Sequence, residues 1–242
     1  MLPVFNYILK EFVMAIVKNF IGGLSGRVGD KIYRNFNGKI VVSSAPTKYV
    51  IPNDPESVAR REKFLFISKI ASAVLKNFII KNLWAKANIK CISPYHKFIK
   101  INRPIVDNSY NVSFLRLIPN DCMNVKVSVK SILISKNEIV VEIFPLSNSL
   151  NLSIVKAPII SVQGVLFFMN ADKPNKEKFL AFPVSSDDVK SALDEVLTFN
   201  IKLDGEVLVH FDSYPLKKAL LCMIMKTYSG EPFHVSNSFT GE

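Results

Sequence analysis

The stretch KIYRNFNGKIVVSS, residues 31–44, decides the fold of the N-terminal part of the chain. Two short runs of alternating polar and apolar residues flank Asn37 and Gly38. Asn-Gly is a preferred dipeptide of type I′ turns, because both central residues of that turn need a positive φ. The pattern therefore predicts a β-hairpin with its turn at Asn37 and Gly38.

Alternation along the first strand of this hairpin sorts its side chains onto two faces. Ile32, Arg34 and Phe36 share one face, and Tyr33 and Asn35 share the other. Basic and aromatic side chains surround the hairpin, a combination that can hold phosphates and stack on bases. The candidate interaction residues here are Arg27, Lys31, Tyr33, Arg34, Phe36, Lys39 and Lys48.

Glycines recur every third residue just before the hairpin, at Gly23, Gly26 and Gly29. Their spacing matches neither the Walker phosphate loop nor the GxGxxG dinucleotide fingerprint. A tight loop in which backbones approach closely is the interpretation we favour over a phosphate cradle.

A long helix is predicted over residues 55–87. Asp54 is suited to cap it, Pro55 to its first position and Glu56 to the positive end of its dipole. Apolar residues then recur at spacings of three and four, which forms one helical stripe about 50 Å long. Arg60 and Arg61 at its start complete the set of candidate interaction residues. Ser93-Pro94 predicts a short second helix or turn.

From residue 105 the pattern changes to short alternating or apolar runs, which are typical of strands. One helix is predicted among them, capped by Ser186 and with Val189, Leu193, Val196 and Leu197 as its apolar side. The predicted strands cover residues 125–130, 138–144, 159–169, 179–184, 206–211 and 219–227.

These patterns predict an α+β protein: an N-terminal β-hairpin plus long helix, followed by a mainly antiparallel, immunoglobulin-like β-sandwich. Residues 1–21 form an apolar N-terminal arm, and 22–104 form a basic hairpin-plus-helix module. Residues 105–242 form the β-sandwich region, either one sandwich or two small ones.

Positive charge is concentrated in the N-terminal part. Residues 1–104 contain 18 basic and 5 acidic residues, a net charge of +13, whereas residues 105–242 contain 13 basic and 15 acidic residues, or −2. Such asymmetry favours an anionic partner, although a solvated basic face is the plain alternative. Hydrophobic residues make up 49% of the chain, which indicates a folded protein.

No convincing catalytic constellation is present. The three cysteines are widely spaced, and no histidine lies in a metal-binding motif, so neither a metal nor a cofactor is expected. Cys91 and His96 are close in sequence but lack an activating motif, and Cys222 lies in an apolar run typical of a core. The acidic pairs Asp187-Asp188 and Asp194-Glu195 are interpreted as a helix start and a solvated face. We therefore expect a non-enzymatic protein.

The apolar N-terminal residues 2–25 are interrupted by Lys10, Glu11 and Lys18. No uncharged run reaches the roughly 18 residues that a membrane span needs, so no transmembrane segment is expected. A signal peptide is not expected either, and Met14 is an alternative start to Met1. We expect the cytoplasm or a virion-like assembly as the setting.

Residues 23–46, GLSGRVGDKIYRNFNGKIVVSSAP, resemble the opening of an uncharacterised bacterial and prophage-associated family with the pattern GxSGKxGxxxYRxxxGKxxVRxxP. A following stretch around Arg60 to Phe64 and a Tyr95-x-x-Phe98 pair extend the resemblance over residues 14–100. Arg27 replaces the usual lysine of that pattern, and Ser43 stands where arginine is common. The resemblance implies a C-terminal β-sandwich and a structural or interaction role, without catalytic residues.

Two functions follow as expectations. The first is a structural or assembly protein that docks on other protein subunits through its basic N-terminal module, as an oligomer or within a larger complex. The alternative is a nucleic-acid-binding protein that uses the same module.

Overall fold

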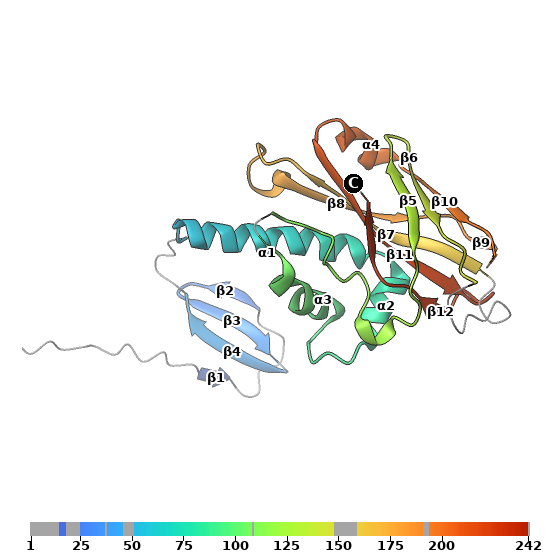
Figure 1. Cartoon of the computed structure of the whole chain (residues 1–242). Coiled ribbons are helices and arrows are strands. Elements are labelled where there is room, and N and C mark those ends of the chain that lie inside the picture. The colour runs from blue at the N-terminus through green and yellow to red at the C-terminus, as the bar shows by residue number, and fades with distance from the viewer. Residues whose placement is uncertain are drawn as a thin grey trace, which may run out of the picture. The chain divides into compact units, whose positions relative to one another are not determined.

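The computed structural model describes residues 15–17, 25–36, 38–45, 51–107, 109–147, 159–190 and 194–241 (Figure 1). Its contacts divide the chain into two compact units, Met1–Asn53 and Asp54–Glu242, called here the N-terminal unit and the C-terminal unit. Of the predicted N-terminal arm, only residues 15–17 lie within the described residues, and they form a strand.

The described residues of the N-terminal unit form a four-stranded antiparallel sheet with the order β1-β4-β3-β2. The predicted hairpin is confirmed as β3 and β4, with Phe36 opposite Lys39 beside the turn. Gly38 has the positive φ, 76°, that the turn requires. Asn37 and Lys48 lie outside the described residues. The strands are β1 (Ala15–Val17), β2 (Gly26–Val28), β3 (Lys31–Phe36) and β4 (Lys39–Ser44).

The predicted long helix is in fact two helices, α1 (Pro55–Val74) and α2 (Phe78–Lys86). Asp54 caps α1 as predicted, since its carboxylate accepts a 2.8 Å hydrogen bond from the Ser57 amide. The prediction of one helix to residue 87 is wrong because Asn77 starts a new one. The Asn77 side chain accepts hydrogen bonds from two amides of the next turn, at 3.0 and 3.2 Å.

The helical region ends with α3 (Pro94–Asn102), which confirms the predicted short second helix. Its N-cap is Ser93, whose hydroxyl accepts a hydrogen bond of 3.4 Å from the His96 amide. In the described part of the chain that follows, three short 3₁₀ turns lie at Arg103–Ile105, Asn120–Cys122 and Asn175–Lys178.

Two antiparallel sheets follow within the described residues. The smaller has the order β10-β6-β5, and the larger has the order β12-β11-β7-β8, with β13 on β11 and β9 on β7. The smaller sheet contains β5 (Val129–Ile134), β6 (Glu138–Ile143) and β10 (Leu197–Lys202). The larger contains β7 (Ile159–Met169), β8 (Phe179–Ser185), β9 (Val189–Lys190), β11 (Leu216–Lys226), β12 (Pro232–Val235) and β13 (Phe239–Gly241).

Three local predictions in this region are wrong. The strand predicted over residues 125–130 begins only at Val129, the first residue of β5. Residues 206–211 belong to a helix, α4 (Gly205–Phe211), not to a strand. The helix predicted after Ser186 is absent from the described residues, where β9 and β10 lie instead. Ser186 forms two hydrogen bonds with Val162 of β7. The Ser186 amide donates to the Val162 carbonyl at 2.8 Å, and the Ser186 hydroxyl accepts from the Val162 amide at 2.9 Å.

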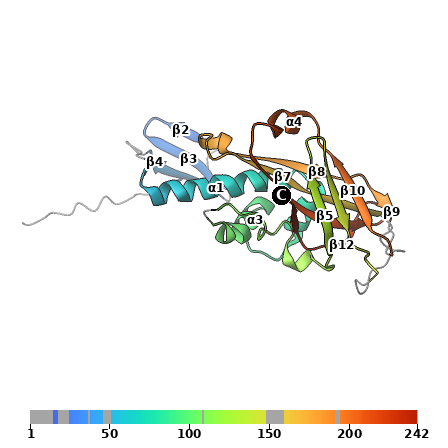
Figure 2. The same cartoon turned by 45° about the horizontal axis from the view of Figure 1, so that its top comes forward.

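The larger sheet has a buried core on each face. One face packs against the smaller sheet, and Val141, Phe168 and Phe199 belong to this core. The other face packs against the helices, and Phe66 and Phe167 belong to that core. Figures 1 and 2 show α1, α2 and α3 on one side of β7 and β11, and β5, β6 and β10 on the other.

The mixed α+β class and the antiparallel C-terminal sheets are thus confirmed. The units, however, divide at Asn53/Asp54 and not at the predicted boundary after residue 104. The physical reason is the packing of α1 on the larger sheet. Phe66 makes edge-to-face contacts with Phe167 at 4.9 Å and with Phe179 at 5.4 Å between ring centroids. The helices therefore belong with the C-terminal sheets, and the basic hairpin stands in a unit without them.

Candidate interaction surface on the N-terminal sheet

The register of the N-terminal sheet gathers three of the candidate cations on one face. Residues directly opposite each other in an antiparallel pair point to the same side of the sheet. Arg34 is opposite Val41, Lys39 is opposite Phe36, and Arg27 is opposite Ile32, the neighbour of Arg34 two residues along β3. This side, called the basic face, carries Arg27, Ile32, Arg34, Phe36, Lys39, Val41 and Ser43.

The opposite side, called the apolar face, carries only one cation among its described residues. That cation is Lys31, which lies 3.6 Å from the carboxylate of Asp30 and donates a 3.5 Å hydrogen bond to the Ser44 hydroxyl. The apolar face carries Gly26, Val28, Lys31, Tyr33, Asn35, Ile40, Val42 and Ser44. Lys31 and Tyr33 are therefore on the other side of the sheet from Arg27, Arg34, Phe36 and Lys39.

Among the residues that the structure describes, the basic face has no acidic side chain. Asp30 is the one acidic residue among the described residues of this unit, and it lies in the β2–β3 turn. Arg34 and Lys39 are exposed, while the Nε of Arg27 donates a 2.9 Å hydrogen bond to the Gly29 carbonyl. Three positive charges without local compensation give this face a positive potential that attracts anions.

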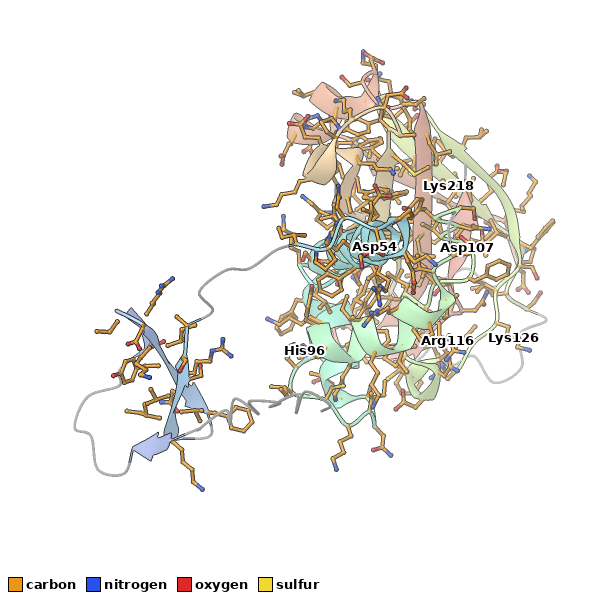
Figure 3. All side chains as sticks on the ribbon, turned by 90° about the vertical axis from the view of Figure 1, so that its left-hand side faces the viewer. Asp54, His96, Asp107, Arg116, Lys126 and Lys218 are labelled. Carbon is orange, nitrogen blue, oxygen red and sulfur yellow. The ribbon has the colours of Figure 1, made fainter. Side chains whose placement is uncertain are left out.

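The sheet has almost no core of its own. In the described part of the N-terminal unit, Ile40 and Ala45 are the only buried apolar side chains. Phe36 is 65% exposed and Val28 is 59% exposed. Figure 3 shows side chains projecting from both faces of the sheet. Both faces thus present apolar and aromatic surface, which marks contact surfaces in folded proteins.

The hairpin turn holds Phe36 and Lys39 in place at the end of the basic face. Asn35 on β3 accepts a 3.1 Å hydrogen bond through its side-chain oxygen from the Gly38 amide. At the other end of the hairpin, the Ala45 amide donates to the Asp30 carbonyl at 2.6 Å. The strand pairing and the hydrogen bonds at the two ends of the hairpin together position the side chains of the basic face.

The helical candidates Arg60 and Arg61 belong to the C-terminal unit. Arg60 donates a 2.9 Å hydrogen bond to the Ser57 hydroxyl of its own helix, and Arg61 also interacts with other residues of the protein. Further along, the Lys97 ammonium donates to the carbonyls of Ala85 and Ala87 at 2.7 Å each, at the C-terminal end of α2. Part of the predicted basic surface therefore stabilises helices.

The residues considered for chemistry are Cys91, His96, Cys222 and the acidic pairs. The His96 ring, on α3 (Figure 3), is paired with the Ser93 hydroxyl at 2.8 Å, and Cys91 is a free cysteine. Cys222 is fully buried, as expected of a core residue, and burial raises the pKa of its thiol. The described residues contain no group of three or more His, Cys, Asp or Glu that could hold a metal ion. Asp188, a member of the acidic pair Asp187-Asp188, forms an ion pair with Lys226.

Sequence reasoning missed one polar cluster. The Tyr110 hydroxyl donates to the Glu62 carboxylate at 2.7 Å, and the Lys178 ammonium donates to the same oxygen at 2.9 Å. These bonds hold the pKa of Glu62 below its ordinary value, while burial raises that of Tyr110. The three residues form hydrogen bonds with one another and anchor α1 to the residues before β8. No sequence signal links them, because they lie far apart along the chain.

No protein-family model and no curated protein matches the chain. Two chains of solved structures match part of it, both of β-glucosidase from Kluyveromyces marxianus, one selenomethionine-labelled and one in complex with glucose. They show 14% and 13% sequence identity and TM-scores of 0.21 and 0.19 over 52% and 50% of this chain. The matches span only 16% and 14% of those chains, and likenesses this weak carry no argument. Among the described residues, no helix is both long and apolar enough to cross a membrane.

Proposed function

We propose that the protein is a non-enzymatic assembly protein whose N-terminal sheet docks on another protein subunit through its apolar face. The lack of a core in this sheet carries the proposal, since Ile40 and Ala45 are the only buried apolar side chains of its described residues. Small sheets are stable in water when a hydrophobic face is covered. A subunit packed on the apolar face would provide that cover.

A second copy of this chain is the subunit that the charges favour. The apolar face meets its own copy without net repulsion, because Lys31 is paired with Asp30. Two basic faces would instead oppose three cations to three cations, an unfavourable arrangement. Symmetric pairing of one patch with itself is also the commonest interface of homo-oligomers.

The C-terminal unit supplies the body of the subunit in this proposal. Its two sheets share one core, which supports the β-sandwich expected from the sequence. Immunoglobulin-like domains often serve as binding modules, although the larger sheet here has six strands, with β9 and β13 in addition to the path β12-β11-β7-β8. The setting stays as expected from the sequence, the cytoplasm or a virion-like particle.

Light scattering of the full-length protein over a range of concentrations tests the proposal. The expected mass exceeds that of a monomer and increases with concentration. Val42→Thr, on the apolar face, should weaken association roughly tenfold, because it replaces a half-buried methyl group that the interface would bury fully by a hydroxyl group. Val41→Thr is the matched control, since Val41 is the neighbouring half-buried valine on the basic face.

A monomeric mass at every concentration would contradict the proposal. Equal weakening by the two valine substitutions would contradict the choice of face.

A further inference from the structure

The basic face combines cations and an exposed aromatic ring within a short distance. Arg34 and Phe36 are two residues apart on β3, which separates them by about 7 Å along the strand. Lys39 lies directly across from Phe36 on β4, and Arg27 adds a third cation from β2. The Phe36 ring is 65% exposed although it lies on a paired strand.

This combination suits one class of anion better than others. Phosphate groups attract arginine and lysine through a sequence-independent electrostatic interaction. An exposed aromatic ring adds a second contact only when the ligand offers flat bases that are free to stack, as single strands do. In a duplex the bases are already stacked and paired, so the Phe36 ring would have no partner there. An acidic protein surface would neutralise the cations but give no role to the ring.

We propose that the basic face of the N-terminal sheet binds single-stranded nucleic acid, with phosphates at Arg27, Arg34 and Lys39 and a base stacked on Phe36. The binding goes beyond the assembly role, because it uses the opposite face of the sheet from the docking face. A protein subunit can therefore occupy the apolar face while a nucleic-acid strand occupies the basic face.

The sheet supplies its own matched control. Lys31 is a hairpin lysine like Lys39, but the register places it on the apolar face. Replacing either lysine by glutamine removes the same charge from the same unit. Binding through overall charge alone responds equally to Lys31→Gln and Lys39→Gln, whereas binding at the basic face responds only to Lys39→Gln.

Fluorescence anisotropy of the full-length protein with a labelled single-stranded oligothymidylate of about 20 nucleotides tests the inference. The double variant Arg34→Gln/Lys39→Gln should weaken binding and reduce the slope of log K against log salt by about 1.4, as about 0.7 is expected per lost phosphate contact. Phe36→Leu should weaken binding roughly tenfold and leave that slope unchanged. Lys31→Gln should match the unmodified protein, and Arg34→Lys should keep the slope. Circular dichroism confirms that each variant retains its strands.

Three results would overturn the inference: no binding at low salt, equal losses for Lys31→Gln and Lys39→Gln, or displacement of the oligonucleotide by polyglutamate at an equal concentration of charge. The last result would assign the face to an acidic protein. Light scattering of the same variants separates this inference from the assembly proposal. Variants of the basic face that no longer bind the oligonucleotide should have the same mass in solution as the unmodified protein. A lower mass for these variants would also overturn the separation of the two faces.

Discussion

Tyr110 and Glu62 are joined by a 2.7 Å hydrogen bond, in which the phenolic hydroxyl donates to the carboxylate. The ring of Tyr110 also packs on Phe66 of α1 and on Phe179 of β8, with centroid distances of 5.3 and 4.9 Å. One side chain therefore connects the helical layer with the larger sheet, by a polar contact at its tip and by apolar contacts along its ring.

Removing only the hydroxyl tests the polar contact. Tyr110→Phe should lower the free energy of unfolding by about 1.5 kcal/mol, because a hydrogen bond to a charged group is lost. The measurement is urea denaturation followed by circular dichroism. Tyr228→Phe is the control, since Tyr228 is 84% exposed and should change stability by less than about 0.5 kcal/mol. Equal unfolding midpoints for both variants and the unmodified protein would show that the bond contributes nothing.

His234 should make stability depend on pH. It is 9% exposed, neither ring nitrogen has a hydrogen-bond partner in the described part of the chain, and burial lowers its pKa. The unfolded chain binds a proton at this residue below about pH 6.5, whereas the folded protein does so only at lower pH. The contribution of neutral His234 to stability is therefore complete above pH 6.5 and is lost as the pH falls from there to the folded-state pKa.

Urea denaturation between neutral and mildly acidic pH measures this effect. His234→Leu should be at least as stable as the unmodified protein at neutral pH and should lose less stability on acidification. His96→Asn, which alters an exposed histidine, should keep the original pH dependence. If His234→Leu retains it as well, the assignment to His234 is wrong.

Asn102 should be among the most sensitive positions of the helical layer. It is fully buried, its amide group donates to the carbonyls of Phe98 and Arg116 at 3.1 and 3.0 Å, and its oxygen accepts from the Arg116 amide at 2.7 Å. Asn102→Ala should cost about 3 kcal/mol, because buried backbone groups lose their partners. The exposed Asn200 provides the control variant Asn200→Ala. A similar small change for both variants in thermal denaturation would refute this role.

Strong local signals made much of the fold predictable. The Asn-Gly turn predicted β3 and β4, Asp54 predicted the start of α1, and the apolar run at residues 159–169 predicted β7 with the bounds that the structure has. Each of these signals depends on neighbours in sequence.

The errors arose where two periodicities fit the same residues. The alternating valines Val207 and Val209 indicate a strand, yet Val207, Leu208 and Phe211 contact the core at helical spacing. Asn77 was a readable helix cap in the middle of an apolar stripe, and its signal was outweighed by the stripe.

The candidate surface was predictable in composition but not in arrangement. The sequence alone predicts that Arg34 and Phe36 lie on the opposite face of the sheet from Tyr33, because side chains alternate within one strand whatever the neighbouring strands are. Placing Arg27 and Lys39 beside Arg34 requires the register of β2 and β4. The assignment of Arg60 and Arg61 to another unit depends on the packing of α1 on the larger sheet, which local patterns do not encode.

The proposed assembly role requires that another subunit completes the N-terminal sheet. Amide hydrogen exchange of β3 and β4 in the full-length protein, measured at a low and a high concentration, tests it most directly. If a second copy covers the sheet, protection of these strands should increase with concentration, while that of β7 and β11 should not. Protection of β3 and β4 that is independent of concentration would show that no second copy completes the sheet.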